Sequence, residues 1–185
     1  MLLILFFATC LLVLFFYFQF TFFRKSVSMP TAINSNFIAQ INDCFIPTAA
    51  VYGYMLRITA GFRSTTTQEV LYQQGRTING HIVTEAGAGK SIHNYGYAVD
   101  VVDRWRGYNI NWMRLVKIGA YCGLESGGEG DLPHFEERRG LTTTDFANGL
   151  RPSPLVLPCP IMAERASSTQ SLTLADLDKC SAPKF

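Results

Sequence analysis

The chain has 185 residues, is 48% apolar and carries a formal net charge of +2. That length suits one globular domain, and so small a charge gives no reason to expect a nucleic-acid partner. Charged residues make up 16% of the chain, below the roughly 25% of an average soluble protein. Together these values exclude a disordered chain, a collagen, a coiled coil and a polytopic membrane protein.

The N-terminus explains the shortage of charge. Residues 1–23 form one apolar run without a charged residue, and the run ends at Arg24 and Lys25. About 20 helical residues cross the hydrocarbon core of a bilayer, so the run is long enough for a transmembrane helix. A cleaved secretory signal is the alternative, but no basic residue precedes the run and residues 26–28 make a poor cleavage site. We predict a transmembrane anchor or signal over residues 1–25.

The remaining chain mixes helical and strand-like periodicity. In chain order, the predicted elements are a helix over 32–45, a strand over 55–59, a helix over 65–74, a strand over 96–102, a helix over 111–121 and a strand over 134–136. Ser64 is a suitable N-cap for the second helix, and Gly75 a suitable stop. Strands and helices interleave irregularly, which predicts an α+β domain over residues 26–150. Four prolines then predict an irregular tail over residues 151–185.

Two of the three histidines lie among other metal-binding residue types. His93 precedes Asp100 by seven residues, with Gly96 between them, and His134 follows Asp131 by three. Two imidazoles and one carboxylate form a three-ligand set for Zn²⁺ that leaves a fourth position for water. Gly96 permits a sharp bend, so that His93 could turn back toward Asp100. A carboxylate that is not a ligand must take the proton of the water, and Asp131 is close enough in sequence to do so.

These segments resemble the M15 family of zinc peptidases, which cut the stem peptides of peptidoglycan. Residues 91–100 read Ser-x-His-x-x-Gly-x-Ala-x-Asp, and residues 131–136 read Asp-x-Pro-His-Phe-Glu. Upstream, residues 61–64 and 83–84 also look like that family, so the resemblance spans about residues 55–137. It implies a small antiparallel sheet with flanking helices.

The resemblance also implies roles for single residues. His93, Asp100 and His134 would be the ligands of one Zn²⁺ per chain. Asp131 would be the general base and acid, and Arg63 would steady the oxyanion and the substrate. Other residues that could contact the ligands or the substrate are Ser91, Gln68 and Glu136.

The residue type of the base predicts the bond that is cut. Aspartate at position 131 is typical of the family's endopeptidase branch, so we expect hydrolysis of the L-Ala-D-Glu bond. A D-Ala-D-Ala carboxypeptidase is the alternative within the family. A non-catalytic module that binds the wall or a partner protein is the alternative of another class.

The resemblance extends to partners and location. We expect a peptidoglycan stem peptide as substrate, a membrane contact through residues 1–23, no nucleic acid and a monomeric chain. A wall peptidase must face the wall, so the expected location is membrane-anchored with a periplasmic or otherwise extracytoplasmic domain. If the protein is phage-encoded, storage in the host cytoplasm until lysis is the alternative.

Some features depart from the family pattern or stay open. Residues 126–128 read Ser-Gly-Gly where the endopeptidase branch has Trp-Gly-Gly, so we expect a different substrate cleft. Glu129 is a second candidate for the base, and His81 has no motif around it. The five cysteines lack Cys-x-x-Cys spacing; Cys159 and Cys180 could form a disulfide or remain thiols.

Several aromatic residues lie between the predicted strand over 96–102 and the start of the predicted helix over 111–121. Trp105, Trp112 and the tyrosines between them are expected in the core rather than on a sugar-stacking surface.

Overall fold

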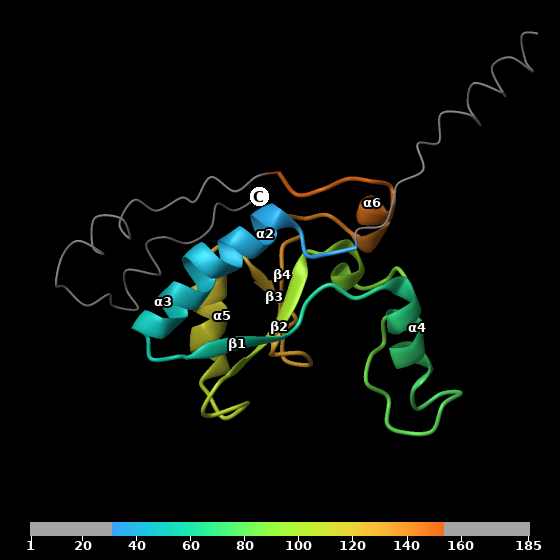
Figure 1. Ribbon diagram of the computed structural model, residues 1–185, viewed down its shortest axis with the longest axis horizontal. Helices are drawn as coiled ribbons and strands as arrows, with labels where there is room; N and C mark the ends of the chain where they lie inside the picture. Colours follow the sequence, from blue (N-terminus) through green and yellow to red (C-terminus); the bar gives the residue numbers. More distant parts are fainter. Residues whose placement is uncertain (1–30, 154–185) are drawn as a thin grey trace, which may run out of the picture.

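A computed structural model describes residues 31–153 of the chain (Figure 1). In chain order the elements are α2 (Ser35–Gln40), the π-helical turn η1 (Ile41–Phe45), α3 (Ile46–Val51), β1 (Leu56–Ala60), α4 (Thr65–Gln73), the 3-10 turn η2 (Ile92–Tyr95), β2 (Ala98–Asp103), α5 (Trp112–Tyr121), β3 (Glu125–Ser126), β4 (His134–Glu136) and α6 (Thr143–Ala147). The predicted N-terminal segment and the pair Cys159 and Cys180 lie outside the described residues.

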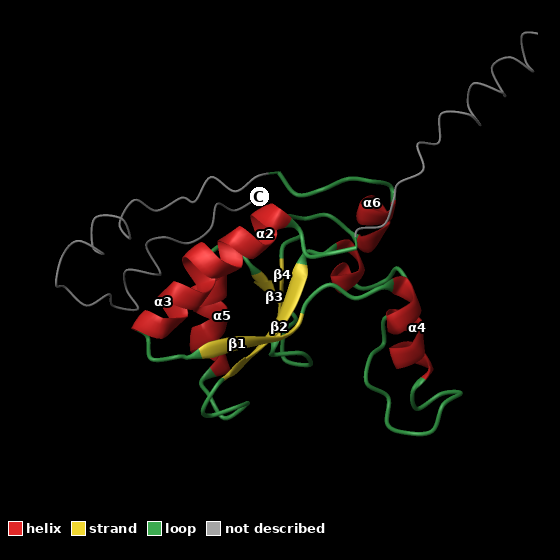
Figure 2. Ribbon diagram, viewed as in Figure 1, coloured by secondary structure: helices red, strands yellow, loops and turns green. Residues whose placement is uncertain are grey.

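The strands form one antiparallel sheet in the order β1-β2-β4-β3. Figure 2 shows α2, α3 and α5 gathered on one side of this sheet, while α4 stands apart on the other side. The α+β class and the small antiparallel sheet predicted from the sequence are therefore confirmed.

The first helical run is longer than its periodicity predicted. It continues through η1 into α3 and ends at Val51. Asn34 caps its start, because its side chain accepts hydrogen bonds from the N–H groups of Asn36 and Phe37. Pro47 has no N–H to donate, and the wider π turn before it accommodates that gap without ending the helix.

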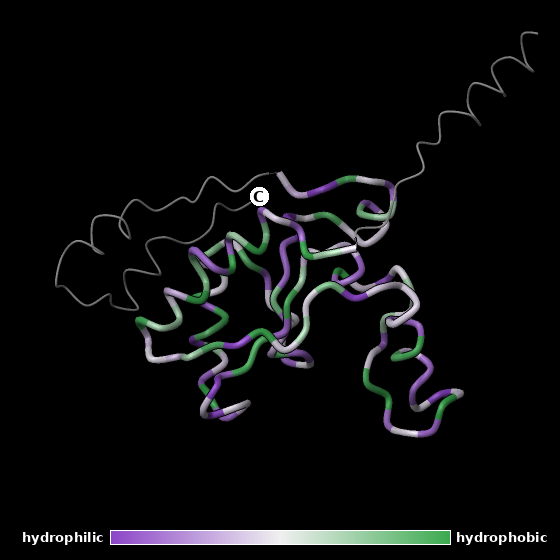
Figure 3. Tube along the Cα trace, viewed as in Figure 1, coloured by the Kyte–Doolittle hydropathy of each residue, from purple (hydrophilic) through white to green (hydrophobic). Residues whose placement is uncertain are grey.

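The core lies between this helical run, α5 and the inner face of the sheet. Burial along β1 alternates, with Leu56 and Ile58 packed against the core and Arg57 exposed. Figure 3 shows the hydrophobic stretches of the trace concentrated where α2, α3 and α5 meet the strands. Fully buried Phe135 of β4 packs against Phe45, with ring centroids 4.6 Å apart. This packing fixes β4, and therefore the strand that carries His134.

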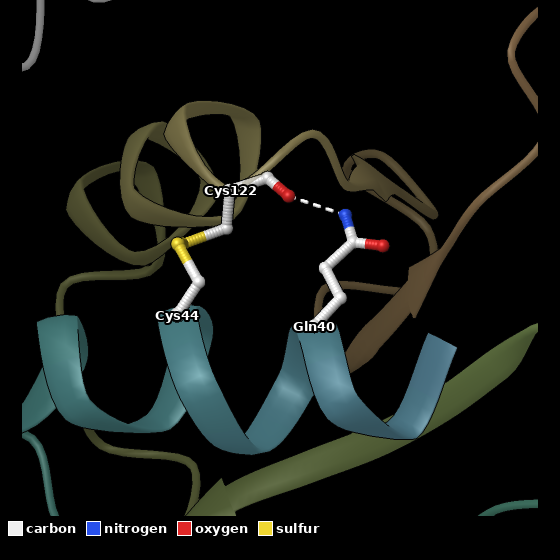
Figure 4. The surroundings of a disulfide bond; sticks show 3 residues. All are labelled: Gln40, Cys44 and Cys122. Carbon is white, nitrogen blue, oxygen red and sulfur yellow. Dashed lines mark hydrogen bonds between the residues drawn. A yellow bond between two sulfur atoms is a disulfide. The ribbon is translucent and has the colours of Figure 1, made fainter. Parts of the chain in front are cut away.

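A disulfide joins Cys44 of η1 to Cys122, at the end of α5 (Figure 4). The two cysteines are 78 residues apart in sequence, and both are buried. The Gln40 side-chain amide donates a hydrogen bond to the Cys122 carbonyl oxygen beside the bridge. Sequence spacing gave no indication of this pair.

The membrane-anchored location predicted from residues 1–23 is wrong, according to the helices of residues 31–153, which the structure describes. None of the helices there is long and apolar enough to cross a membrane. The longest helical run, residues 35–51, is shorter than the ~20 residues that a bilayer requires. It also packs one side against the domain core and exposes Asn42 and Asp43 on the other.

The placement of the aromatic residues near β2 was also wrong. Trp105 is 78% exposed and Tyr108 is 66% exposed, while Trp112 is half-buried at the start of α5. The chain turns away from the sheet after Asp103, so these side chains project beyond the strand instead of into the core.

Candidate metal centre

Three elements bring the predicted ligands together. His93 lies on η2, Asp100 on β2 and His134 on β4. Their nearest atoms are 3.1 Å apart between His93 Nε2 and His134 Nδ1, and 3.2 Å apart between each of these nitrogens and Asp100 Oδ1. All three ligand atoms lie within 4.8 Å of one another.

This spacing fits a small tetrahedral cation. Zn–N and Zn–O bonds of ~2.0–2.1 Å in a tetrahedral site place neighbouring ligand atoms about 3.3 Å apart. The observed separations of 3.1 and 3.2 Å are close to that value. The residues present therefore fit Zn²⁺.

Each histidine is held in the orientation that a metal ligand needs. His93 Nδ1 lies 2.7 Å from the carbonyl oxygen of Gly61 and donates to it, so that Nε2 is the nitrogen whose lone pair would face a bound metal. His134 Nε2 lies 2.8 Å from Glu136 and donates to its carboxylate, which leaves Nδ1 facing Asp100. Arg138 pairs with the other oxygen of Glu136 and so fixes that carboxylate.

Gly96 allows this arrangement, as its position between two of the candidate ligands predicted. Its φ of +77° is in the left-handed region, and a Cβ there would lie 2.5 Å from the backbone oxygen of Ala32. Only glycine therefore fits the turn that returns the chain from His93 to Asp100.

The electrostatics of the cluster favour a positive charge. Burial alone would raise the pKa of Asp100, but hydrogen bonds from His134 and His93 outweigh it and hold that pKa well below its usual range. For His134, burial would lower the pKa, yet the bonds to Asp100 and Glu136 raise it to about 9. The carboxylates that stabilise a protonated imidazole would equally stabilise a bound cation.

Asp131 lies at the edge of the cluster, with its carboxylate 4.0 Å from His134 Nδ1 and 62% exposed. Partial burial raises the pKa of Asp131, and the Asp100 carboxylate adds to this effect, while His134, His93 and Arg63 oppose it. A carboxylate this close to the ligands, yet open to solvent, can exchange a proton with water. Glu129, the other candidate, is exposed and is not among the residues that line the pocket.

Arg63 also lies beside the cluster, with a guanidinium nitrogen 3.7 Å from Asp100. Gln68 of α4 is fully buried and accepts a hydrogen bond of 2.9 Å from Arg63. The same Gln68 amide donates to the carbonyl oxygen of Ala86. Gln68 thus holds the arginine toward the cluster.

The cluster opens into a pocket of about 390 Å³ with mostly polar walls. Of the residues expected at the site, the pocket is lined by Arg63, Ser91, His93, Asp100, Asp131, His134 and Glu136. Gln68 lies behind Arg63, and exposed His81 is not part of the lining.

Sequence reasoning missed two residues that shape the site. Asn94 is fully buried; its amide donates to the Arg63 carbonyl oxygen and its oxygen accepts from the Gly89 N–H. A polar residue directly after His93 was the only available signal. Gly127 packs against Asp131 and His134 so closely that a Cβ would lie 2.6 Å from the Asp131 carbonyl oxygen.

Comparison with known proteins identifies the family. Residues 33–115 match the family described as VanY, D-alanyl-D-alanine carboxypeptidase. The chain is also 37% identical over 117 residues to the peptidoglycan L-alanyl-D-glutamate endopeptidase CwlK of Bacillus subtilis (strain 168), covering 54% of this chain and 70% of that protein. The chain belongs to the M15 (VanY) family of zinc metallopeptidases. The resemblance stated from the motifs is thereby confirmed, and with it the prediction that the protein is an enzyme.

Solved structures of similar proteins include other peptidases. The vancomycin resistance D,D-pentapeptidase VanY, solved as a complex with Zn(II), is 17% identical to this chain with a TM-score of 0.47. The match covers 64% of this chain and 80% of the VanY chain. The L,D-carboxypeptidase DacB of Streptococcus pneumoniae is 22% identical with a TM-score of 0.46, covering 69% and 76%. The L-Ala D-Glu endopeptidase ChiX of Serratia marcescens is 23% identical with a TM-score of 0.37, covering 63% and 85%.

Proposed function

We propose that this protein is a zinc peptidase that hydrolyses peptidoglycan stem peptides at the L-Ala-D-Glu bond. The observation that carries the proposal is the convergence of His93 Nε2, Asp100 Oδ1 and His134 Nδ1 beside a carboxylate and an arginine. The name of the CwlK relative and the aspartate at position 131 support the choice of bond.

His93, Asp100 and His134 would hold one Zn²⁺ per chain. When bound, Zn²⁺ supplies a Lewis acid that polarises a carbonyl and makes water a nucleophile near neutral pH. Asp131 takes the proton of the attacking water and delivers it to the amine of the leaving D-Glu, so that the proton is conserved between the two steps.

Arg63 provides the donors for the developing oxyanion. Because Gln68 already holds one of its guanidinium nitrogens, the arginine is oriented before the substrate arrives. A donor fixed in advance stabilises charge without reorganising during the reaction.

A D-Ala-D-Ala carboxypeptidase is the second candidate, because the matching family description names that activity. The two reactions release different fragments. The endopeptidase frees a peptide that begins with D-Glu, whereas the carboxypeptidase frees single D-Ala. Mass spectrometry of the products released from purified peptidoglycan by the zinc-loaded full chain distinguishes them.

The central prediction concerns the base and one ligand. Asp131→Asn should retain one zinc per chain but lower the rate of hydrolysis by about 10²- to 10⁴-fold, because proton transfer is lost while the ligands remain. His134→Ala should lose the metal and the activity together. Zinc content by atomic absorption and peptide release by mass spectrometry measure both effects.

Full activity of Asp131→Asn would contradict the assignment of the base. If the wild-type chain bound zinc yet released no peptide, and removal of the zinc by a chelator did not alter the products, the non-catalytic module would be the better account.

A further inference from the structure

An exposed strip of the described surface is not used by the proposed chemistry. It consists of Met55 just before β1, of Arg57 and Thr59 on β1, and of Trp105 in the loop after β2. In Figure 1 this loop and the segment after α4 both extend toward the lower edge of the view, on either side of the strands.

Strand register places Arg57, in the β1 part of the strip, on the face of the sheet that carries the metal cluster. Arg57 lies opposite Val102, and directly paired residues point to the same face. Val102 and Asp100 are two residues apart on β2, so Arg57 shares its face with Asp100. The Thr59 hydroxyl donates to the Asp100 carbonyl oxygen at 3.2 Å, which brings the strip up to the cluster.

The strip runs outward from the cluster along β1. Ala60, the last residue of β1, pairs with Asp100, and Leu56, the first residue of β1, pairs with Asp103 at the end of β2. Four residues of β-strand span ~13 Å, and Trp105 extends the strip beyond that.

The far end of the strip is rigidly held. Asp103 is only 1% exposed, and its carboxylate accepts hydrogen bonds from the backbone N–H groups of Met55, Trp105 and Arg106, at 2.9, 3.0 and 2.8 Å. The Arg106 guanidinium donates both to this carboxylate and to the Gly53 carbonyl oxygen. The loop is thereby fastened to the start of β1, although Trp105 at its tip is mostly in solvent.

The chemistry of the strip is mixed. Trp105 and Met55 are exposed apolar side chains, Arg57 is an exposed guanidinium on β1, and no ion pair links Arg57 to another of the residues the structure describes. Aromatic faces pack against the C–H face of a sugar ring, while a guanidinium donates to hydroxyl and acetamido oxygens. An exposed apolar patch with polar neighbours is typical of a recognition site.

We propose that this strip binds the glycan strand of peptidoglycan, a polymer of N-acetylated sugars. The inference rests on the proposed function. The L-Ala of a stem peptide is joined directly to the lactyl group of a sugar, so a bond cut after L-Ala lies beside the glycan. A substrate seated at Asp100 must therefore leave its sugar chain close to the cluster, and the strip is an exposed surface that adjoins the cluster at Thr59.

Binding of the full-length, zinc-loaded chain to glycan strands stripped of their stem peptides tests the proposal. Trp105→Ala should weaken the apparent Kd by about fivefold, since a stacked aromatic contributes on the order of 1 kcal/mol. Arg57→Gln should weaken binding in the same direction. Leu150→Ala, which truncates an exposed apolar residue outside the strip, should bind as wild type does.

A second readout compares two substrates. For Trp105→Ala, the ratio of the rate on intact wall to the rate on a soluble stem peptide should fall relative to wild type.

Glycan binding that is equal in wild type and Trp105→Ala, or absent in both, would overturn the proposal. If Trp105→Ala instead changed only self-association in sedimentation velocity, a second copy of the chain would be the occupant. Failure of wild type to cleave the soluble peptide would count against the proposed function and leave the glycan measurement intact.

Discussion

Among single residues, Asp103 shows how a charged side chain can be kept inside a small domain. It is buried at the end of β2, and its two oxygens accept four hydrogen bonds. The bond from the Arg106 guanidinium is the main cause that holds the pKa of Asp103 well below its usual range, and the backbone N–H groups add to it against the opposing effect of burial. An unpaired carboxylate at this position would be strongly destabilising.

This lowered pKa predicts how stability depends on pH. Because the folded state keeps Asp103 ionised, its contribution is fully present above the unfolded pKa of about 3.9 and is lost as the pH falls toward the folded value. Asp103→Asn should therefore be less stable at neutral pH, and its free energy of unfolding should fall less steeply between about pH 5 and pH 2. Urea unfolding of the metal-free chain at several pH values measures the slope.

Asp43→Asn is the matched control, since it removes an exposed carboxylate outside this network. Parallel pH profiles for wild type and Asp103→Asn would show that the buried carboxylate does not carry the acid sensitivity.

At the scale of elements, the segment between β3 and β4 decides where Asp131 stands. The Gly127 N–H donates to the His134 carbonyl oxygen, and the Asp131 N–H donates to Gly128. The loop therefore folds tightly onto the start of β4. The sequence showed a shortened loop without the usual tryptophan, but not that Gly127 must touch both the candidate base and a candidate ligand.

We expect Gly127→Ala to displace these two residues. A Cβ at this position would lie 2.9 Å from the Asp131 Cβ and 3.0 Å from the His134 Cβ, and the backbone oxygen of Asp131 is closer still. The value of kcat/KM for a stem peptide should fall by about 10- to 100-fold, with weaker zinc binding in a chelator competition.

Gly130→Ala serves as the control in the same loop, because a Cβ there meets no atom within 4 Å. Equal losses in the two variants would point to general sensitivity of the loop rather than to this contact.

At the scale of the whole molecule, the Cys44–Cys122 disulfide ties the first helical run to the end of α5. These two elements form the layer that covers the sheet on the side away from the metal cluster. The bridge therefore supports the scaffold on which β2 and β4 present the candidate ligands.

Removal of this bridge should lower the free energy of unfolding by about 4.5 kcal/mol in the chain-entropy account, because its cysteines are 78 residues apart in sequence. The comparison is between wild type and Cys44→Ala/Cys122→Ala in urea unfolding without reductant. The same variant with reductant measures any contribution from the other cysteines. A difference below about 1 kcal/mol would mean that the helical layer holds together without the bridge.

The elements and the candidate ligands were predictable because their signals are local. Apolar periodicity located the helices and strands. Ser64 was predicted to be the N-cap of α4, and its side chain does cap that helix. His93, Asp100 and His134 were identified from residue type and short spacing, with Gly96 as the reason that the first two could meet.

The tertiary structure alone decided what depends on distant contacts. The partner of Cys44, the contact of His93 with Gly61 and the buried role of Gln68 each join residues far apart in sequence, which periodicity cannot encode. Trp105 was expected in the core because aromatic residues usually gain most from burial. Its exposure follows from the turn that Asp103 fixes, since hydrogen bonds to one buried carboxylate direct the loop into solvent.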